Sequence, residues 1–349
     1  MTDALPGTAP APNATSATTK PLVEVEGLHL DLEVAGRRRL VLRDVSLTLE
    51  RGEALGLVGE SGAGKSMTAR AIARLLPPRA STTGSIRFDG TDFLALRGEE
   101  LRRARTEMAV IFQDPRAYIN PVRRIGDFLT EQLRTVGKVD RADAFRRAQE
   151  MLTAVGITDT ARRMRQYPSD LSGGMLQRVM IASALLGEPK LILADEPTTA
   201  LDVTTQSEVM AILDELRYDA GVALLFITHD LDLAAAVCDR TAVMYAGEIV
   251  ESEESEELHR NTWHPYTAAL AAARPDLAHP RPRLPAIDGR PVGAWEADPT
   301  CAFAVRCPHR LPLCTESGPV PLTHEGEHAV RCLRATDDEV RAALGGGAI

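Results

Sequence analysis

The chain shows two hydrophobic patterns, and their order along the sequence predicts the class of fold. Residues 23–32 and 40–49 alternate between apolar and polar positions, as half-buried strands do. Residues 191–195 and 222–227 form continuous apolar runs. Such runs are typical of central strands in a parallel sheet that is covered on both faces. The patterns therefore predict an α/β fold with a parallel core sheet and an antiparallel sheet near the N-terminus.

Shorter segments complete this outline. We expect strands over 54–59, 84–88 and 108–112, helices over 67–76, 99–105 and from Val179, and a hairpin over 242–250. Residues 125–165 are mostly helical and strongly charged, which indicates a helical insertion on the core. A helix that starts near Val203 has Asp202 as its expected N-cap. Proline density rises after Arg274, which favours extended chain to about Trp295.

Composition narrows the class of function. No apolar run approaches the roughly 20 residues that cross a bilayer. Residues 1–20 are rich in Thr, Ala and Pro and lack the basic and apolar regions of a secretory signal, so we expect a disordered tail on a cytoplasmic chain. The net charge of −9 disfavours a general nucleic-acid binder.

One motif predicts nucleotide binding. The pattern G-x-x-x-x-G-K-[ST] is matched by Gly59, Glu60, Ser61, Gly62, Ala63, Gly64, Lys65 and Ser66. Glycines let successive backbone N–H groups turn into one concavity that holds an anion. Lys65 adds positive charge near the terminal phosphates, and the Ser66 hydroxyl can bind Mg²⁺. A strand precedes this loop and a helix follows from Met67, so the helix dipole faces the phosphates. A chance glycine-rich turn is the alternative.

Polar residues at the ends of three apolar strands are candidates for the chemistry. Strand 191–195 ends in Asp195 and Glu196: the first carboxylate can hold Mg²⁺, and the second can polarise an attacking water. Strand 222–227 is followed by His229, which can contact a γ-phosphate, although a histidine there often only forms a structural hydrogen bond. Gln113 follows strand 108–112 and can reach Mg²⁺ and the water.

A second segment has the features of an anion site. Ser172, Gly173 and Gly174 precede Gln177 and Arg178 in a predicted helix start. The free N–H groups of a helix N-terminus and the helix dipole favour phosphate. Taken alone, this segment is better explained as a simple helix cap.

These motifs together resemble the ATPase subunits of ABC transporters. The phosphate loop, Gln113, LSGGM at 171–175, LADEP at 193–197, TALD at 199–202 and His229 occur in the order of that family. The resemblance covers about residues 22–275. It implies a P-loop NTPase (RecA-like) core with an antiparallel β subdomain and a helical ABC subdomain. It also implies a head-to-tail dimer in which each ATP lies between one phosphate loop and the other subunit's LSGG segment.

The resemblance also assigns roles to residues. It implies that Glu196 is the general base, that His229 senses the γ-phosphate and that Asp202 belongs to the dimer interface. Three residues are expected to serve Mg²⁺: Ser66, Gln113 and Asp195. The nucleotide is expected to contact the loop residues 59–66, Met67 at the start of the helix, and the partner's Ser172, Gly173 and Gly174. Because all these residues are present, we expect hydrolysis and not binding alone.

The adenine site departs from the family pattern. The family usually stacks an aromatic side chain from the segment before the phosphate loop on adenine, but no Phe, Tyr or Trp precedes Phe88. We expect adenine to rest on aliphatic side chains near Leu32 or Val41. A stacking aromatic contributes on the order of 1 kcal/mol, so modest affinity and loose purine selectivity are predicted.

Other segments resemble one branch of the family. FQDP at 112–115, INP at 119–121 and HPYT at 264–267 are similar to the D-type ATPase of oligopeptide, dipeptide and nickel importers. The resemblance implies a second, F-type ATPase or a second copy of this chain, two permeases and an external solute-binding protein. It places the chain at the cytoplasmic face of the membrane as a peripheral subunit. The alternatives are a nickel or metallophore importer, an ABC ATPase of DNA maintenance, and a subunit with impaired hydrolysis.

Four cysteines crowd into the last fifty residues: Cys301, Cys307, Cys314 and Cys332. Disulfides are rare in the cytoplasm. Four thiolates can bind a [4Fe–4S] cluster, which some members of the branch hold, or Zn²⁺. Zinc modules more often use close C-x₂-C pairs, and none occurs among these four. Free thiols are the third interpretation.

These features divide the chain into five parts. They are a disordered tail (1–21), a first part of the ATPase core (22–115), a helical subdomain that ends in the LSGG signature (116–178), a second part of the core (179–256) and a C-terminal peptide-importer extension with the cysteines (257–349).

Overall fold

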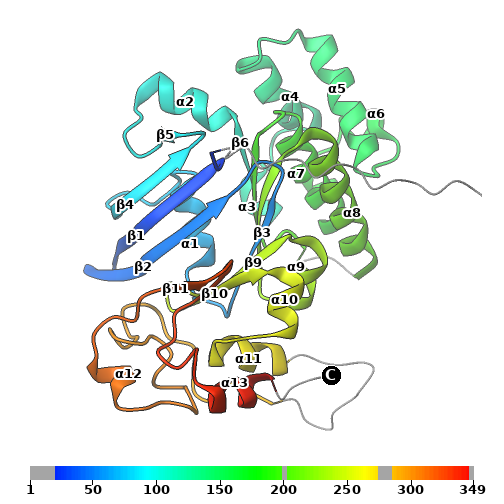
Figure 1. Cartoon of the computed structure of the whole chain (residues 1–349). Coiled ribbons are helices and arrows are strands. Elements are labelled where there is room, and N and C mark those ends of the chain that lie inside the picture. The colour runs from blue at the N-terminus through cyan, green and yellow to red at the C-terminus, as the bar shows by residue number, and fades with distance from the viewer. Residues whose placement is uncertain (1–19, 199–202, 274–284, 346–349) are drawn as a thin grey trace, which may run out of the picture.

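An antiparallel sheet forms the N-terminal part of the protein (Figure 1). The computed structural model describes residues 20–198, 203–273 and 285–345. The strand order is β2-β1-β4-β5, with β1 Val23–Val34, β2 Arg37–Leu49, β4 Ser81–Phe88 and β5 Thr91–Asp92. The predicted strands are confirmed, and all three are longer than predicted. Ala35 and Gly36 both have positive φ and form the turn between β1 and β2, so the charged strand ends can pair up to it.

A second sheet carries the core of the fold. Its order is β11-β12-β10-β9-β3-β8-β7-β6. The parallel strands are β3 Ala54–Val58, β6 Met108–Ile111, β7 Leu191–Asp195, β8 Ala223–Thr228 and β9 Arg240–Tyr245. Antiparallel strands extend it: β10 Glu248–Glu254, β11 Thr323–Glu325 and β12 His328–Val330. The predicted hairpin is β9–β10.

Alternate residues of the central strands enter different cores. Leu193 and Leu225 pack with the N-terminal sheet and α1 (Lys65–Ile72), whereas Ala194 and Phe226 pack with helices of the opposite face. This is the two-residue period of a strand, expressed in a sheet that is apolar on both sides. The continuous apolar runs in the sequence follow from it.

Helices cover the sheet and build a lobe beside it (Figure 1). The helices of the first half are α2 Gly98–Thr106, α3 Pro115–Tyr118, α4 Ile125–Thr135, α5 Arg141–Ala154, α6 Thr160–Arg163 and a 3₁₀ turn Pro168–Asp170. Those of the second half are α7 Gly173–Leu185, α8 Val203–Ala220, α9 Leu231–Val237, α10 Ser255–Arg260, α11 Pro265–Ala272, α12 Leu313–Glu316 and α13 Asp338–Gly345. No helix in the described ranges has the length and apolarity that a membrane span needs.

Two helix starts differ from the predictions. The helix α1 begins at Lys65 and not at Met67, because Gly64 adopts a left-handed conformation directly before it. The helix α7 begins at Gly173 and not at Val179, because the Ser172 hydroxyl accepts the N–H of Met175 and caps the helix there. Asp202, the expected N-cap of α8, lies outside the described residues.

The C-terminal extension is part of the core sheet. The strand β12 pairs with β10 through Glu251–Val330 and Ser252–Ala329. Residues 285–295 contain no helix or strand in the structure, as the proline content predicts. A cluster of buried aromatic side chains joins the extension to the sheet, and includes Tyr245, Tyr266 and Phe303.

Candidate nucleotide site

The phosphate loop joins β3 to α1, and two of its glycines are required by space. A Cβ atom on Gly59 would lie 2.1 Å from the carbonyl oxygen of Met244, and one on Gly64 would lie 2.8 Å from Leu42 Cδ2. Both residues also have positive φ, which L side chains rarely adopt. The loop is therefore folded tightly against β2 and β9, with the N-terminus of α1 at its end.

Lys65 is buried beneath this loop. Its ammonium Nζ donates to the carbonyl oxygens of Gly59 (2.6 Å) and Glu60 (3.1 Å). Burial lowers the pKa of Lys65, and the neighbouring carboxylates of Glu196 and Asp195 act in the opposite direction. Two neutral carbonyl oxygens thus hold the Lys65 ammonium at the loop. A phosphate group can replace these oxygens as its partner.

Ser66 and Asp195 meet at the ends of α1 and β7. The Ser66 hydroxyl donates to Asp195 Oδ1 at 2.8 Å, and Asp195 is 8% exposed. Burial raises the pKa of Asp195, while the hydrogen bond from Ser66 lowers it. A hydroxyl and a carboxylate at this separation are a suitable ligand pair for a hard, oxygen-binding cation such as Mg²⁺.

Glu196 lies between the other two strand-end candidates. Gln113 Nε2 donates to Glu196 Oε2 at 2.8 Å, and His229 Nδ1 lies 3.6 Å from Glu196 Oε1. The Glu196 backbone is left-handed (φ 45°), a conformation that costs of order 1 kcal/mol, and its N–H donates to Ile227. His229 is 62% exposed, so its ring is open to a bound molecule. The ends of β6, β7 and β8 thus bring these three residues together.

The LSGG segment lies apart from this cluster. Ser172 and Gly173 start α7, on the helical lobe, and no hydrogen bond within the described residues joins them to the phosphate loop. One chain therefore brings together most of the predicted site: the phosphate loop, Gln113, Asp195, Glu196 and His229. The LSGG signature is not part of this cluster.

The region expected to receive adenine contains an aromatic residue from far along the chain. Leu32 and Val41 are both partly buried against the N-terminal core, as aliphatic contacts. Trp295 is 46% exposed, and the Arg39 guanidinium lies 5.0 Å from the centre of its ring. Trp295 lies far beyond the phosphate loop in the sequence, so the family pattern, which concerns the segment before the loop, does not include this indole.

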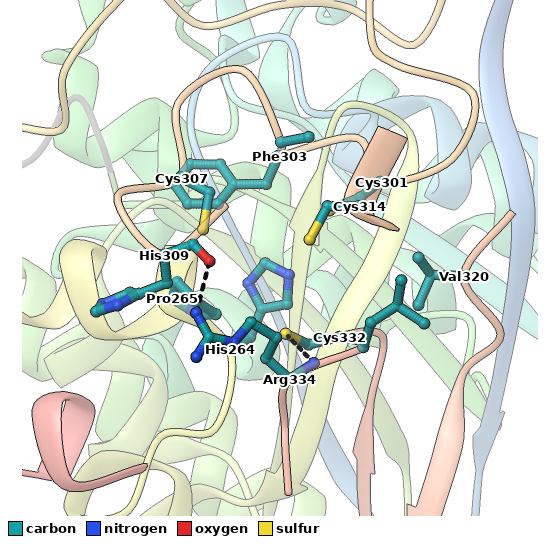
Figure 2. A pocket seen from close by; sticks show the side chains of 12 residues that line it. His264, Pro265, Cys301, Phe303, Cys307, His309, Cys314, Val320, Cys332 and Arg334 are labelled. Carbon is teal, nitrogen blue, oxygen red and sulfur yellow. Dashed lines mark hydrogen bonds between the residues drawn. The ribbon is translucent and has the colours of Figure 1, made fainter. Parts of the chain in front are cut away.

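The four C-terminal cysteines line one cavity (Figure 2). His264 and Phe303 line it too. Burial raises the pKa of Cys301 to about 12 and that of Cys332 to about 11, and the nearby thiols add to both shifts. Within the described residues, no three metal-ligating side chains are already arranged to hold an ion.

Sequence reasoning missed the residues that hold Glu60. Arg306 forms a paired ion bridge to its carboxylate, and the Tyr266 hydroxyl accepts its backbone N–H at 2.9 Å. Arg306 is separated from Glu60 by 246 positions, so no local pattern connects them. Tyr266 belongs to the HPYT segment, whose sequence indicates only a resemblance to the importer branch.

The fold and the site define a P-loop nucleotide hydrolase of the α/β class. Family models agree: residues 42–199 match the ABC transporter model, and residues 250–314 match the C-terminal region of oligopeptide/dipeptide transporters. The chain belongs to the family of ATP-binding subunits of ABC transporters, and it is an ATPase.

Curated relatives span most of the chain. The dipeptide transport ATP-binding protein DppD of Bacillus subtilis is 39% identical over 94% of this chain and 98% of its own. A probable peptide ABC transporter ATP-binding protein of Sinorhizobium fredii is 43% identical, over 85% and 90%. The oligopeptide transport ATP-binding protein OppD of Salmonella typhimurium is 41% identical, over 86% and 90%.

Solved structures have the same fold. An ATP-binding cassette, solved as a dimer in a post-hydrolysis state with ADP and phosphate, superposes with a TM-score of 0.61. It is 28% identical, and the match covers 67% of this chain and 98% of that one. A subunit of an ABC transporter complex from Clostridium perfringens has a TM-score of 0.59 at 26% identity, over 69% and 91%.

Proposed function

We propose that this chain hydrolyses ATP to power the import of peptides across the cytoplasmic membrane. The observation that carries the proposal is the C-terminal extension, which matches the oligopeptide/dipeptide transporter region and packs on the nucleotide core. Relatives named for peptide transport add support. The partners are two membrane permeases, an external solute-binding protein, and either an F-type ATPase or a second copy of this chain. The subunit lies peripherally at the cytoplasmic face.

In this proposal the strand-end residues perform the hydrolysis. Glu196 accepts the proton of the attacking water, and its contacts with Gln113 and His229 support that role because they orient the carboxylate. His229 contacts the γ-phosphate. Ser66, Gln113 and Asp195 would hold Mg²⁺, which would supply positive charge beside the phosphates. Lys65 and the loop amides bind the phosphates themselves.

The second half of each site comes from a partner subunit. Ser172, Gly173 and Gly174 would contact the nucleotide held by the partner's loop, and Asp202 would lie at the same interface. Two observations support this: the segment has no hydrogen bond to its own loop among the described residues, and a similar cassette was solved as a dimer. The N-terminus of α7, which Ser172 caps through the N–H of Met175, has the helix dipole that suits a phosphate.

A Glu196→Gln variant tests the function in the reconstituted transporter. We expect ATP turnover to fall at least a hundredfold, because the amide cannot take a proton, while ATP still binds. Peptide uptake into proteoliposomes should stop with it. The control is Glu100→Gln, an exposed glutamate on α2, which should leave both rates unchanged.

Three outcomes would contradict the proposal. Unchanged turnover in Glu196→Gln would remove the base assignment. Uptake of a nickel chelate but of no peptide would favour the metallophore alternative. ATPase stimulation by DNA at moderate salt would favour a role in DNA maintenance.

We also propose that the cysteine cavity holds a metal cofactor, a [4Fe–4S] cluster or, alternatively, Zn²⁺. The donor set fits because four thiols line one cavity (Figure 2). Backbone N–H groups face three of the sulfurs, those of Cys301, Cys307 and Cys332. The backbone nitrogen of Arg334 lies 3.4 Å from Cys332 Sγ and donates its N–H to it. Such N–H···S contacts stabilise thiolate ligands. Because burial raises the pKa of Cys301, Cys307 and Cys332, metal binding would release protons. The metal would hold the extension together.

Metal content tests the cofactor. Anaerobically purified protein should be brown and contain about four iron atoms per chain if it carries a cluster. Cys301→Ser should lose the colour, whereas Cys238→Ala, at a buried thiol in another core, should keep it. Zinc at one atom per chain would select the alternative. Folded protein that is colourless and free of iron and zinc would refute both.

A further inference from the structure

Glu60 is a phosphate-loop residue whose side chain and backbone are both held by the C-terminal extension. Arg306 Nη1 lies 2.6 Å from Glu60 Oε2, and Nη2 lies 3.2 Å from Oε1. Tyr266, on α11, accepts the Glu60 N–H through its hydroxyl. Two separate segments of the extension thus converge on one position of the loop.

The arginine is fixed by its own surroundings. Its side chain is 4% exposed, Nε donates to the carbonyl oxygen of Asp288 at 2.7 Å, and Nη2 donates to that of Ile287 at 3.3 Å. The guanidinium also lies over the ring of Tyr245. A paired arginine–carboxylate bridge is geometrically specific, and here its arginine side is buried while Glu60 is 21% exposed. Removing the Glu60 charge would leave the buried Arg306 guanidinium without its carboxylate partner.

Glu60 connects this bridge to Lys65, the lysine of the phosphate loop. The carbonyl oxygens of Gly59 and Glu60 are the acceptors that hold Lys65 Nζ. A shift of Glu60 would therefore move the Lys65 ammonium and the loop amides that follow in sequence. Displacements of about 1 Å in a phosphate-binding site are costly, since binding depends on prearranged geometry.

We propose that Arg306 is a positioning residue for ATP binding, which acts through Glu60 and is assisted by Tyr266. The C-terminal extension thereby becomes a structural part of the nucleotide site. The inference rests on the ATPase function and adds to it a group that lies outside the ABC transporter match, which ends at residue 199.

The test measures MgATP affinity and turnover in the full-length chain. Arg306→Gln should raise the Kd and KM for ATP about tenfold, equivalent to about 1.4 kcal/mol, while kcat per folded molecule changes less than threefold. Glu60→Gln should act similarly, and the double variant should be no worse than either single variant. The matched control is Arg290→Gln, which breaks an exposed two-point bridge to Glu296 in the same extension.

Two results would overturn the inference. One is an unchanged ATP affinity in Arg306→Gln, equal to that of Arg290→Gln. The other is a double variant whose loss is the sum of the two single losses. If Arg306→Gln fails to fold, Tyr266→Phe removes only the acceptor for the Glu60 N–H and should still weaken ATP binding severalfold; unchanged affinity there would count against the proposal. A wild-type chain that binds no ATP would instead refute the function.

Discussion

At the residue scale, local motifs predicted most of the candidate site. Lys65, Ser66, Asp195, Glu196 and His229 each follow a strand directly or lie in a fixed loop pattern, so short stretches of sequence carry their positions. Residues brought in from the extension could not be found in this way. Arg306 and Trp295 become neighbours of the nucleotide core only through long-range packing, which no local pattern records.

The adenine contact gives a residue-scale prediction. Because no aromatic residue precedes the loop, the chain should bind ATP only modestly and should bind GTP within about tenfold of ATP. Competition binding with both nucleotides measures this. Tight ATP binding with strong rejection of GTP would contradict it. If that preference disappeared in Trp295→Ala, the indole beside Arg39 would be the stacking group.

At the element scale, the start of α11 explains the His264-Pro265-Tyr266 sequence. His264 Nδ1 accepts the backbone N–H of Tyr266 at 3.0 Å and caps the helix. The backbone N–H of His264 donates to the buried Glu251 carboxylate. Pro265 occupies the first helical position, where it needs no donor. Tyr266 is then aimed at Glu60. Each residue type has a physical reason at its place.

The cap also makes stability depend on pH. Burial lowers the pKa of His264 to about 3, against 6.5 for an ordinary histidine. Between these values the unfolded chain binds the extra proton, so stability is full above pH 6.5 and is lost as the pH falls towards 3. Between pH 7 and pH 5, the free energy of unfolding measured in urea should fall by about 2 kcal/mol more in wild type than in His264→Asn. The asparagine keeps a hydrogen-bond acceptor but does not titrate.

The control for this measurement is His324→Asn, at an exposed position on β11. It should keep the wild-type dependence on pH. Equal losses in wild type and His264→Asn, at matched metal content, would contradict the role of His264.

Sequence patterns predicted strands best where both faces of the strand are buried. The strands β7 and β8 were predicted within one residue because their apolar runs are continuous. The strands β11 and β12 were missed: they have three residues each, and β11 is exposed throughout. The start of β4 was missed because residues 81–84 are polar or glycine and only partly covered.

At the scale of the whole molecule, the C-terminal extension and the ATPase core form one structure. The strand β12 extends the sheet, the aromatic cluster around Phe303 fills the junction, and Arg306 reaches the phosphate loop. The sequence predicts a C-terminal extension over 257–349 but does not predict that it joins the core sheet, because pairing between distant strands leaves no local pattern. The class of fold was predicted, but not this integration.

The central claim is that two subunits enclose MgATP, with the loop of one facing the signature of the other. Sedimentation velocity of Glu196→Gln, alone and with its partner ATPase, tests it most directly. We predict a dimer that forms only with MgATP and that is lost when Ser172→Arg is added to this chain, while the Ser172→Arg monomer still binds ATP. A monomer at saturating MgATP in both mixtures, or loss of ATP binding by the Ser172→Arg monomer, would contradict the account.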